Sequence, residues 1–177
     1  VHALSLRTGD VLWHSDSLPV TFHDTIYEYE ANTVAPTVGP EGNVYVGTAD
    51  GLSALDGSDG SVKWVVKDMN AVASPAVVDG TVFALGTNSV TAVDVSGEEV
   101  WRLSIERGER PVPPAAGESI VVAATEDGIL GLDPATGDQR WISDRRIETY
   151  PVVKEGRCFV GDYEGLHAID IGSGADV

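Results

Sequence analysis

The chain of 177 residues contains little cysteine, little lysine and no long apolar run. Its one cysteine, Cys158, excludes an internal disulfide and any multi-cysteine zinc or iron–sulfur site within these residues. No apolar stretch approaches the roughly 18 residues of a membrane-spanning helix. The segment that begins at Val1 is not expected to be a signal peptide, because it follows the same pattern as the rest of the chain.

The charge is strongly one-sided. Aspartate and glutamate number 28 against 11 lysines and arginines, so the net charge is −17 and the isoelectric point is near 4.3. Such a surface would repel the phosphates of nucleic acids and of anionic membranes, so neither is predicted as a partner. The acidic residues are spread along the whole chain, and the lysines are only Lys63, Lys67 and Lys154. This pattern favours adaptation to high salt and a halophilic origin, with an acidic binding face as the alternative.

Apolar residues make up 42% of the chain, which is enough to bury a core. Glycine occurs 20 times and proline 9 times, and few segments favour a helix. This composition predicts an all-β fold of short strands and tight turns.

A repeat of roughly 40 residues runs through the whole chain. Its markers are an aspartate and, about eight residues later, a tryptophan: Asp56, Asp94, Asp133 and Asp170, and Trp13, Trp64, Trp101 and Trp141. Each unit predicts four short strands separated by glycine-containing turns, with the tryptophan on the last strand. Four antiparallel strands in this length are typical of a β-propeller blade. The units cover residues 1–13 (partial), 34–64, 73–101, 112–141 and 150–177 (partial), with residues 14–33 as an insertion loop.

The two marker residues have a structural interpretation. The aspartate can accept hydrogen bonds from the backbone of the turn that follows it. The tryptophan offers a large apolar face to the next blade and an indole N–H that needs a carbonyl acceptor. We therefore predict that both residue types join neighbouring blades, with a ligand-stacking platform of tryptophans as the alternative.

The motif that runs from Ala54-Leu55-Asp56 through Gly60 to Trp64 resembles the quinoprotein-type, or PQQ-like, β-propeller repeat. This repeat is shared by pyrroloquinoline quinone (PQQ) dehydrogenases and BamB-like assembly lipoproteins. The first unit departs from the motif, with Ser5 in place of the aspartate. The resemblance implies a propeller that acts as a non-enzymatic scaffold or protein-interaction module, in an extracytoplasmic or cell-surface setting. A cytoplasmic location remains open.

Two other functions stay open at this stage. A fragment of a PQQ-dependent dehydrogenase would hold the quinone in the central channel with Ca²⁺ beside it, but no residue set here matches that cofactor site. The adjacent-cysteine disulfide of the alcohol-dehydrogenase branch cannot form with one cysteine. The second alternative is a sensor domain that binds peptide or polysaccharide. We predict no cofactor, no metal site and no catalytic residue.

The number of repeats leaves the ring size open. Members of the resembled family usually have seven or eight blades, and this chain has about four repeats. The sequence therefore favours a segment of a larger propeller, whose remainder or another protein is the expected partner. A homodimer that makes eight blades and a closed ring of four blades are the alternatives.

Candidate binding residues lie just before the innermost strands, where a propeller has its channel mouth. They are Asn70, Arg110, Arg146, Glu148 and Tyr150, with ordinary solvated loops as the alternative interpretation. The histidines of the insertion loop match no metal-ligand spacing. Cys158 is aligned with Val44, Val82 and Ile120 at a buried strand position, which favours a core residue over a nucleophile.

Overall fold

The computed structural model describes residues 1–15, 34–48, 51–69, 71, 73–106 and 112–177. These residues form strands and turns and contain no helix, so none of their elements is a helix that could cross a membrane. The strands are grouped in five antiparallel sheets that follow one another along the chain.

The first sheet pairs β1 (His2–Leu4) with β2 (Val11–His14). The second contains β3 (Thr37–Val38), β4 (Val44–Thr48), β5 (Gly51–Leu55) and β6 (Val62–Lys67). The third contains β7 (Ala76–Val78), β8 (Thr81–Leu85), β9 (Ser89–Asp94) and β10 (Glu99–Ser104). The fourth contains β11 (Ala115–Gly117), β12 (Ile120–Thr125), β13 (Gly128–Leu132) and β14 (Gln139–Ser143), and the fifth β15 (Val152–Lys154), β16 (Arg157–Gly161) and β17 (Leu166–Asp170).

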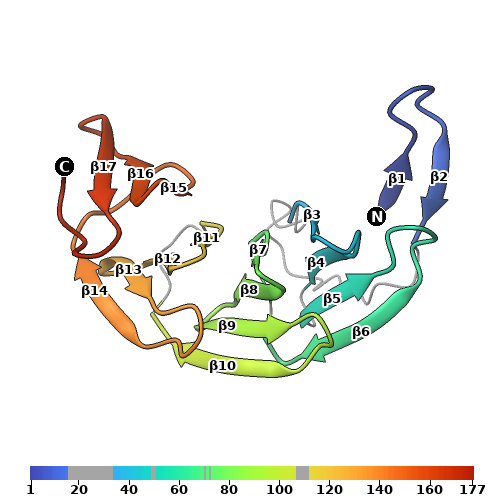
Figure 1. Ribbon diagram of the computed structural model, residues 1–177, viewed down its shortest axis with the longest axis horizontal. Coiled ribbons are helices and arrows are strands. Elements are labelled where there is room, and N and C mark those ends of the chain that lie inside the picture. Colours follow the sequence, from blue (N-terminus) through green and yellow to red (C-terminus); the bar gives the residue numbers. More distant parts are fainter. Residues whose placement is uncertain (16–33, 49–50, 70, 72, 107–111) are drawn as a thin grey trace, which may run out of the picture.

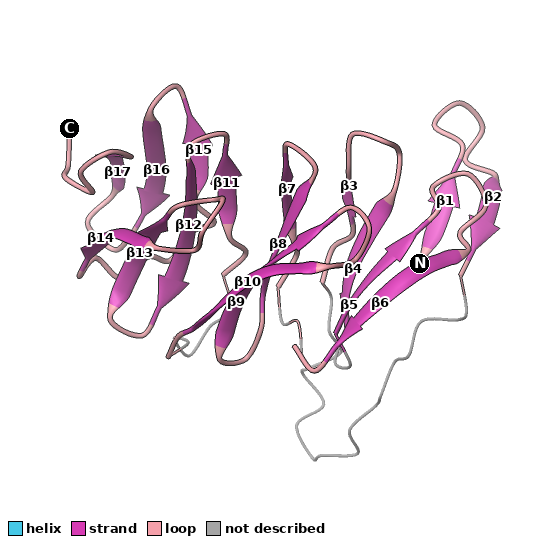
Figure 2. Ribbon diagram, turned by 60° about the horizontal axis from the view of Figure 1, so that its bottom comes forward, coloured by secondary structure: helices cyan, strands magenta, loops and turns pink. Residues whose placement is uncertain are grey.

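The sheets stand side by side along an arc (Figures 1 and 2). The first strands β3, β7, β11 and β15 lie on its concave side, and the last strands β6, β10 and β14 lie on its convex side (Figure 1). Within each sheet, neighbouring strands in the sequence are neighbours in space. This arrangement is an open, partial β-propeller, so the predicted all-β propeller fold is confirmed.

The hydrophobic core lies between the sheets. Phe83 and Leu85 of the third sheet pack with Val121 and Leu132 of the fourth in one buried cluster. Similar clusters join the second sheet to the third and the fourth to the fifth. Because each interior sheet is covered on both faces, β5 is buried along its whole length. The middle strands therefore have apolar residues in succession, without a regular polar alternation.

The strand register corrects one predicted alignment. Cys158, Val44 and Val82 each pair with the residue directly before a motif aspartate. In the fourth sheet Val121 has this position, so the alignment of Cys158 with Ile120 is wrong. Successive side chains of a strand point to opposite faces, and a shift of one residue therefore exchanges the faces. Two adjacent apolar residues look alike in the sequence, and only the hydrogen-bond register separates them.

Candidate functional site

Every tryptophan of the chain contacts the next sheet. The indole N–H groups of Trp13, Trp64, Trp101 and Trp141 donate to the carbonyl oxygens of Gly57, Val95, Pro134 and Ile171, at nitrogen–oxygen distances of 2.9, 2.9, 2.8 and 2.7 Å. Each acceptor directly follows the motif aspartate of the next repeat. The structure thus places all four tryptophans across junctions between blades.

A glycine lies beneath each indole ring. Gly60, Gly97, Gly137 and Gly174 have φ between 74° and 92°, a backbone conformation that favours glycine. A Cβ atom at any of these positions would stand less than 3.0 Å from an indole carbon. Glycine is therefore required for two reasons, the turn conformation and the close approach of the ring.

The motif aspartates hold these turns together. Asp56 accepts hydrogen bonds from the hydroxyl and the backbone N–H of Ser58, and these bonds lower the pKa of its carboxyl. Asp94 and Asp170 bind Ser96 and Ser173 in the same way, with the same effect on their pKa values. Asp133 binds Arg140 in an ion pair of 2.6 Å as well as the turn backbone, which also lowers its pKa. All four carboxylates thus bind within their own repeat and do not themselves bridge two blades, as was predicted for them. They hold the turn whose next carbonyl oxygen accepts the indole N–H of the neighbouring blade.

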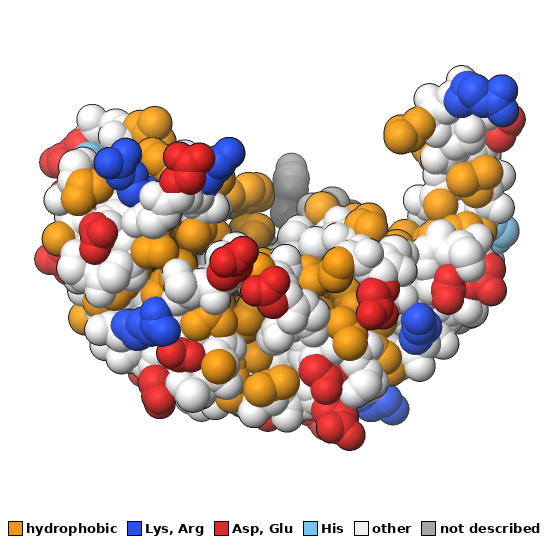
Figure 3. Space-filling view, viewed as in Figure 1, with side chains coloured by type: hydrophobic (Ala, Val, Ile, Leu, Met, Phe, Trp, Pro, Cys, Tyr) orange, Lys and Arg blue, Asp and Glu red, His pale blue; other side chains and the backbone are white. Residues whose placement is uncertain are grey.

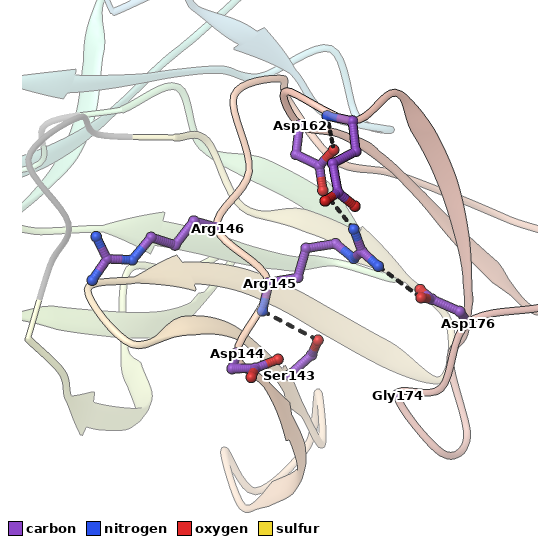
Figure 4. Close-up of a pocket in the computed structure, with 8 residues that line it drawn as sticks. Ser143, Asp144, Arg145, Arg146, Asp162, Gly174 and Asp176 are labelled. Atoms are coloured by element: carbon purple, nitrogen blue, oxygen red, sulfur yellow. Dashed lines mark hydrogen bonds and ion pairs between the residues drawn. The ribbon is translucent and has the colours of Figure 1, made fainter.

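A pocket of about 370 Å³ lies between the fourth and fifth sheets (Figure 4). Its lining is polar: Ser143, Asp144, Arg145, Arg146, Asp162, Glu164, Gly174 and Asp176. Arg145 follows β14 and lies between two carboxylates, with Nη1 against Asp162 and Nη2 at 2.7 Å from Asp176 (Figure 4). The guanidinium therefore joins the end of the fourth sheet to the fifth.

Asp162 is the centre of this charged cluster. Burial raises the pKa of its carboxyl, but hydrogen bonds from the backbone N–H of Glu164, from His167 and from Arg145 outweigh burial. The pKa of Asp162 is therefore well below its ordinary value of 3.8. His167 Nε2 lies 2.9 Å from Asp162 Oδ1. Because an ionised carboxylate only accepts hydrogen bonds, the ring nitrogen is the donor.

The segment of residues 144–150, which makes up most of the loop between β14 and β15, is attached to the end of β16. It is called the 144–150 loop below. The backbone N–H of Glu148 donates to the carbonyl oxygen of Gly161 at 2.8 Å. The N–H of Gly161 in turn donates to the Thr149 hydroxyl at 2.7 Å. Arg146 is exposed and points away from Arg145 (Figure 4), and Tyr150 is 70% exposed.

The predicted channel-mouth residues are only partly described. Arg146, Glu148 and Tyr150 all lie exposed on the 144–150 loop, which leads into the innermost strand β15. Asn70, Arg110 and residues 16–33 of the predicted insertion lie outside the described residues. Their proposed role in binding stays a prediction.

The charged cluster was not singled out from the sequence. Its signal is weak, because Arg145 and Asp162 are 17 residues apart and meet only through the packing of two sheets. Alignment of the repeats gives a partial indication, since Asp162 and His167 stand where the second sheet has Thr48 and Ser53. Among the four described sheets that contain both positions, only the fifth has two ionisable residues there, and this sheet holds the cluster.

Among the described residues, Asp162, Glu164 and His167 could place ligand atoms within 4.8 Å of one another. These donors do not fit Ca²⁺ of a quinone site, because Arg145 already places a positive charge on Asp162 and the other carboxylate oxygen is bonded to backbone N–H groups. The Cys158 thiol does not suit nucleophilic chemistry either. Burial raises its pKa to about 11, so it stays protonated near neutral pH.

Antiparallel four-stranded sheets that are joined by tryptophan–turn contacts define a β-propeller repeat protein. Comparison with known families assigns the chain within this class. The model of the family described as outer membrane protein assembly factor BamB matches residues 1–95 and 86–177. The chain therefore belongs to the BamB family of PQQ-like propeller repeats.

Individual relatives agree with this assignment. The outer membrane protein assembly factor BamB of Burkholderia pseudomallei (strain K96243) is 28% identical over 124 residues, which are 67% of this chain and 32% of that protein. The crystal structure of BamB from Moraxella catarrhalis aligns with a TM-score of 0.66 at 22% identity, over 81% of this chain and 52% of that one. The computationally designed Ika8 protein aligns with a TM-score of 0.67 at 20% identity, over 94% of this chain and 51% of that one. The chain thus spans about a third of its curated relative.

Proposed function

We propose that this chain is a non-enzymatic scaffold that binds other proteins outside the cytoplasm, as part of the assembly of outer-membrane proteins. The family and its Burkholderia member carry this role in their names. The observation that carries the proposal for this chain is the 144–150 loop, a firmly held segment that presents an exposed arginine and an exposed tyrosine.

The loop is suited to binding because its backbone is already ordered. Hydrogen bonds from Glu148 and to Thr149 attach it to β16, and Arg145 is held between Asp162 and Asp176. A partner would therefore lose little free energy in ordering this surface. Tyrosine and arginine are also the residue types that most often dominate protein–protein binding.

The chemistry of the expected partner follows from Arg146 and Tyr150. Arg146 is a cation on a strongly acidic protein, so it selects a carboxylate that the rest of the surface would repel. Tyr150 offers an apolar ring beside the innermost strand. We expect a partner segment with an acidic side chain close to an apolar one. A second copy of the chain is the alternative partner.

The experiment is to measure binding of the chain to solubilised outer-membrane assembly proteins by surface plasmon resonance. Arg146→Ala combined with Tyr150→Ala should weaken binding at least tenfold, because both groups contact the partner. Arg157→Ala combined with Tyr163→Ala is the matched control, since it removes the same residue types at exposed positions outside the 144–150 loop. Equal affinities of the two double variants would contradict the proposed surface.

The proposal includes no cofactor. Equilibrium dialysis of the chain with PQQ and Ca²⁺ tests this part directly. We expect no stoichiometric uptake, because Arg145 opposes a cation at the one cluster with suitable ligands among the described residues. Uptake of one quinone per chain would favour the dehydrogenase alternative instead.

A further inference from the structure

The attachment of the 144–150 loop to β16 depends on one residue of that strand, Gly161. Its backbone N–H donates to the hydroxyl oxygen of Thr149 at 2.7 Å. Its carbonyl oxygen accepts the backbone N–H of Glu148 at 2.8 Å. The second bond joins backbone groups and is open to any residue except proline, whereas the first requires a hydroxyl. A substitution at position 149 can therefore remove one bond and leave the other.

The hydroxyl at this position is specific to the fifth sheet. Thr149 lies three residues before Val152, the first paired residue of β15. Three residues before the first paired residues of β3, β7 and β11, the chain has Val34, Ala73 and Val112. Valine and alanine carry no hydroxyl, so their side chains cannot accept a backbone N–H. Among these four sheets, only the fifth can attach the segment before its first strand in this way.

The missing side chain of Gly161 leaves room for this bond. A Cβ atom on Gly161 would stand 2.8 Å from Cγ2 of Thr149 and 3.1 Å from its hydroxyl oxygen. Gly161 is not among the glycines with a positive φ, so its backbone conformation would accept other residues. Glycine is therefore needed here for the close approach of Thr149 and not for a turn.

Burial does not hold the loop at this point. Thr149 is exposed, whereas its counterparts Ala73 and Val112 are buried. Tyr150 follows Thr149 directly and is 70% exposed, so its ring is not packed into the core either. The bond to the Thr149 hydroxyl thus fixes the backbone directly before one of the two residues proposed to contact a partner.

We infer that Thr149 is a positioning residue, whose hydroxyl sets the fraction of molecules in which the 144–150 loop is attached to β16 and ready to bind a protein partner. This inference rests on the proposed function. Only the attached loop presents Arg146 and Tyr150 in the binding geometry, and Thr149 itself does not touch the partner. The apparent affinity is then the affinity of the attached state reduced by the fraction of molecules in that state.

The test is surface plasmon resonance of the full chain with solubilised outer-membrane assembly proteins, read as separate rate constants. Thr149→Val keeps the shape of the side chain and removes the hydroxyl. Its association rate constant should fall about fivefold, the effect of losing one hydrogen bond. Its dissociation rate constant should stay unchanged, because the contacts in the complex are the same. Gly161→Ala should act in the same way, because its methyl group would stand against Thr149.

Two controls and a second measurement separate positioning from a general effect on the fold. Thr149→Ser keeps the hydroxyl and should restore the association rate constant. Thr125→Val is the matched control, since the Thr125 hydroxyl donates to the carbonyl oxygen of Gly128 in a turn of the fourth sheet. Amide hydrogen exchange of the free chain reports the attachment itself. Exchange at Glu148 and Gly161 should be about fivefold faster in Thr149→Val and unchanged in both controls.

Failure here is distinguishable from failure of the proposed function. If the double variant of Arg146 and Tyr150 binds as its control does, the proposed function fails. If that double variant binds weakly but Thr149→Val associates at the wild-type rate, only the present inference is overturned. A faster dissociation of Thr149→Val at an unchanged association rate would show that Thr149 touches the partner, which also overturns it. Unchanged amide exchange at Gly161 would overturn it without any partner.

Discussion

The interior sheets and the two end sheets have the same residue types at equivalent register positions, but these side chains differ in burial. Leu52 of β5 and Leu166 of β17 have the same register position, yet Leu52 is fully buried and Leu166 is 78% exposed. The same contrast holds between Leu55 and Leu4. Burial in this fold is therefore a property of the junction between two sheets, as expected for a repeat array stabilised by contacts between neighbours.

Replacement of Trp141 by alanine removes the indole contact between the fourth and fifth sheets and so weakens an interior junction. Trp141 is buried against the fifth sheet and donates to the carbonyl oxygen of Ile171. We expect a loss of about 3–5 kcal/mol in the free energy of unfolding, from the cavity and the lost contacts. Urea denaturation followed by circular dichroism measures it. A loss below about 1 kcal/mol would contradict the role of the indole in joining sheets.

Truncation of the two equivalent leucines compares the interior with the end directly. Leu52→Ala should cost about 2–5 kcal/mol, because it leaves a cavity in a close-packed junction. Leu166→Ala should change the free energy of unfolding by less than about 0.5 kcal/mol, because water already covers the side chain. Similar losses in thermal or urea denaturation would mean that the end face is covered in solution.

Two glycines with nearly identical backbone conformation isolate the effect of the indole ring. Gly137 and Gly156 both have φ 75°. An alanine at either position would have to adopt a left-handed conformation, which costs about 1–2 kcal/mol. Only at Gly137 would the added methyl group strike a ring, that of Trp101. Gly137→Ala should therefore be destabilised by about 1–3 kcal/mol more than Gly156→Ala. Equal destabilisation would show that the ring moves aside freely.

The smallest expected effect concerns pH. The folded pKa of Asp162 lies below its ordinary value of 3.8, so the native state favours the ionised carboxylate. Its contribution to stability is therefore complete above about pH 4 and is lost as the pH falls below that value. Urea denaturation of the wild type between pH 6 and pH 3 should show this loss. Asp162→Asn should reduce the slope below pH 4, and unchanged slopes would contradict the assignment.

The salt adaptation inferred from composition remains a prediction. Acidic side chains are scattered over the face shown in Figure 3 and do not gather in one patch there. Dispersed charge of one sign repels itself, and added salt screens the repulsion.

The repeat and its strand order were predictable because each blade has the same short sequence motif at the same spacing. The aspartate, the glycine turn and the tryptophan recur in nearly every unit, and each element forms its turn or strand largely from local interactions. The register within β12 was not predictable, because Ile120 and Val121 are both apolar and each occupies one face of a buried sheet. The arginine–aspartate cluster was missed because its members belong to different sheets.

The sequence by itself determined the blade: its four strands, its turns, and which residue types a blade offers to its neighbours. This information is local, since hydrogen bonds within a turn and alternation along a strand involve residues close in the chain. Only the tertiary structure decided which of these offered groups are used. Trp13 contacts Gly57 and Arg145 contacts Asp162 because neighbouring sheets pack face to face. Gly9 has the same turn conformation as Gly60, and Leu166 has the same register position as Leu52, but both lie open because no described sheet packs on them.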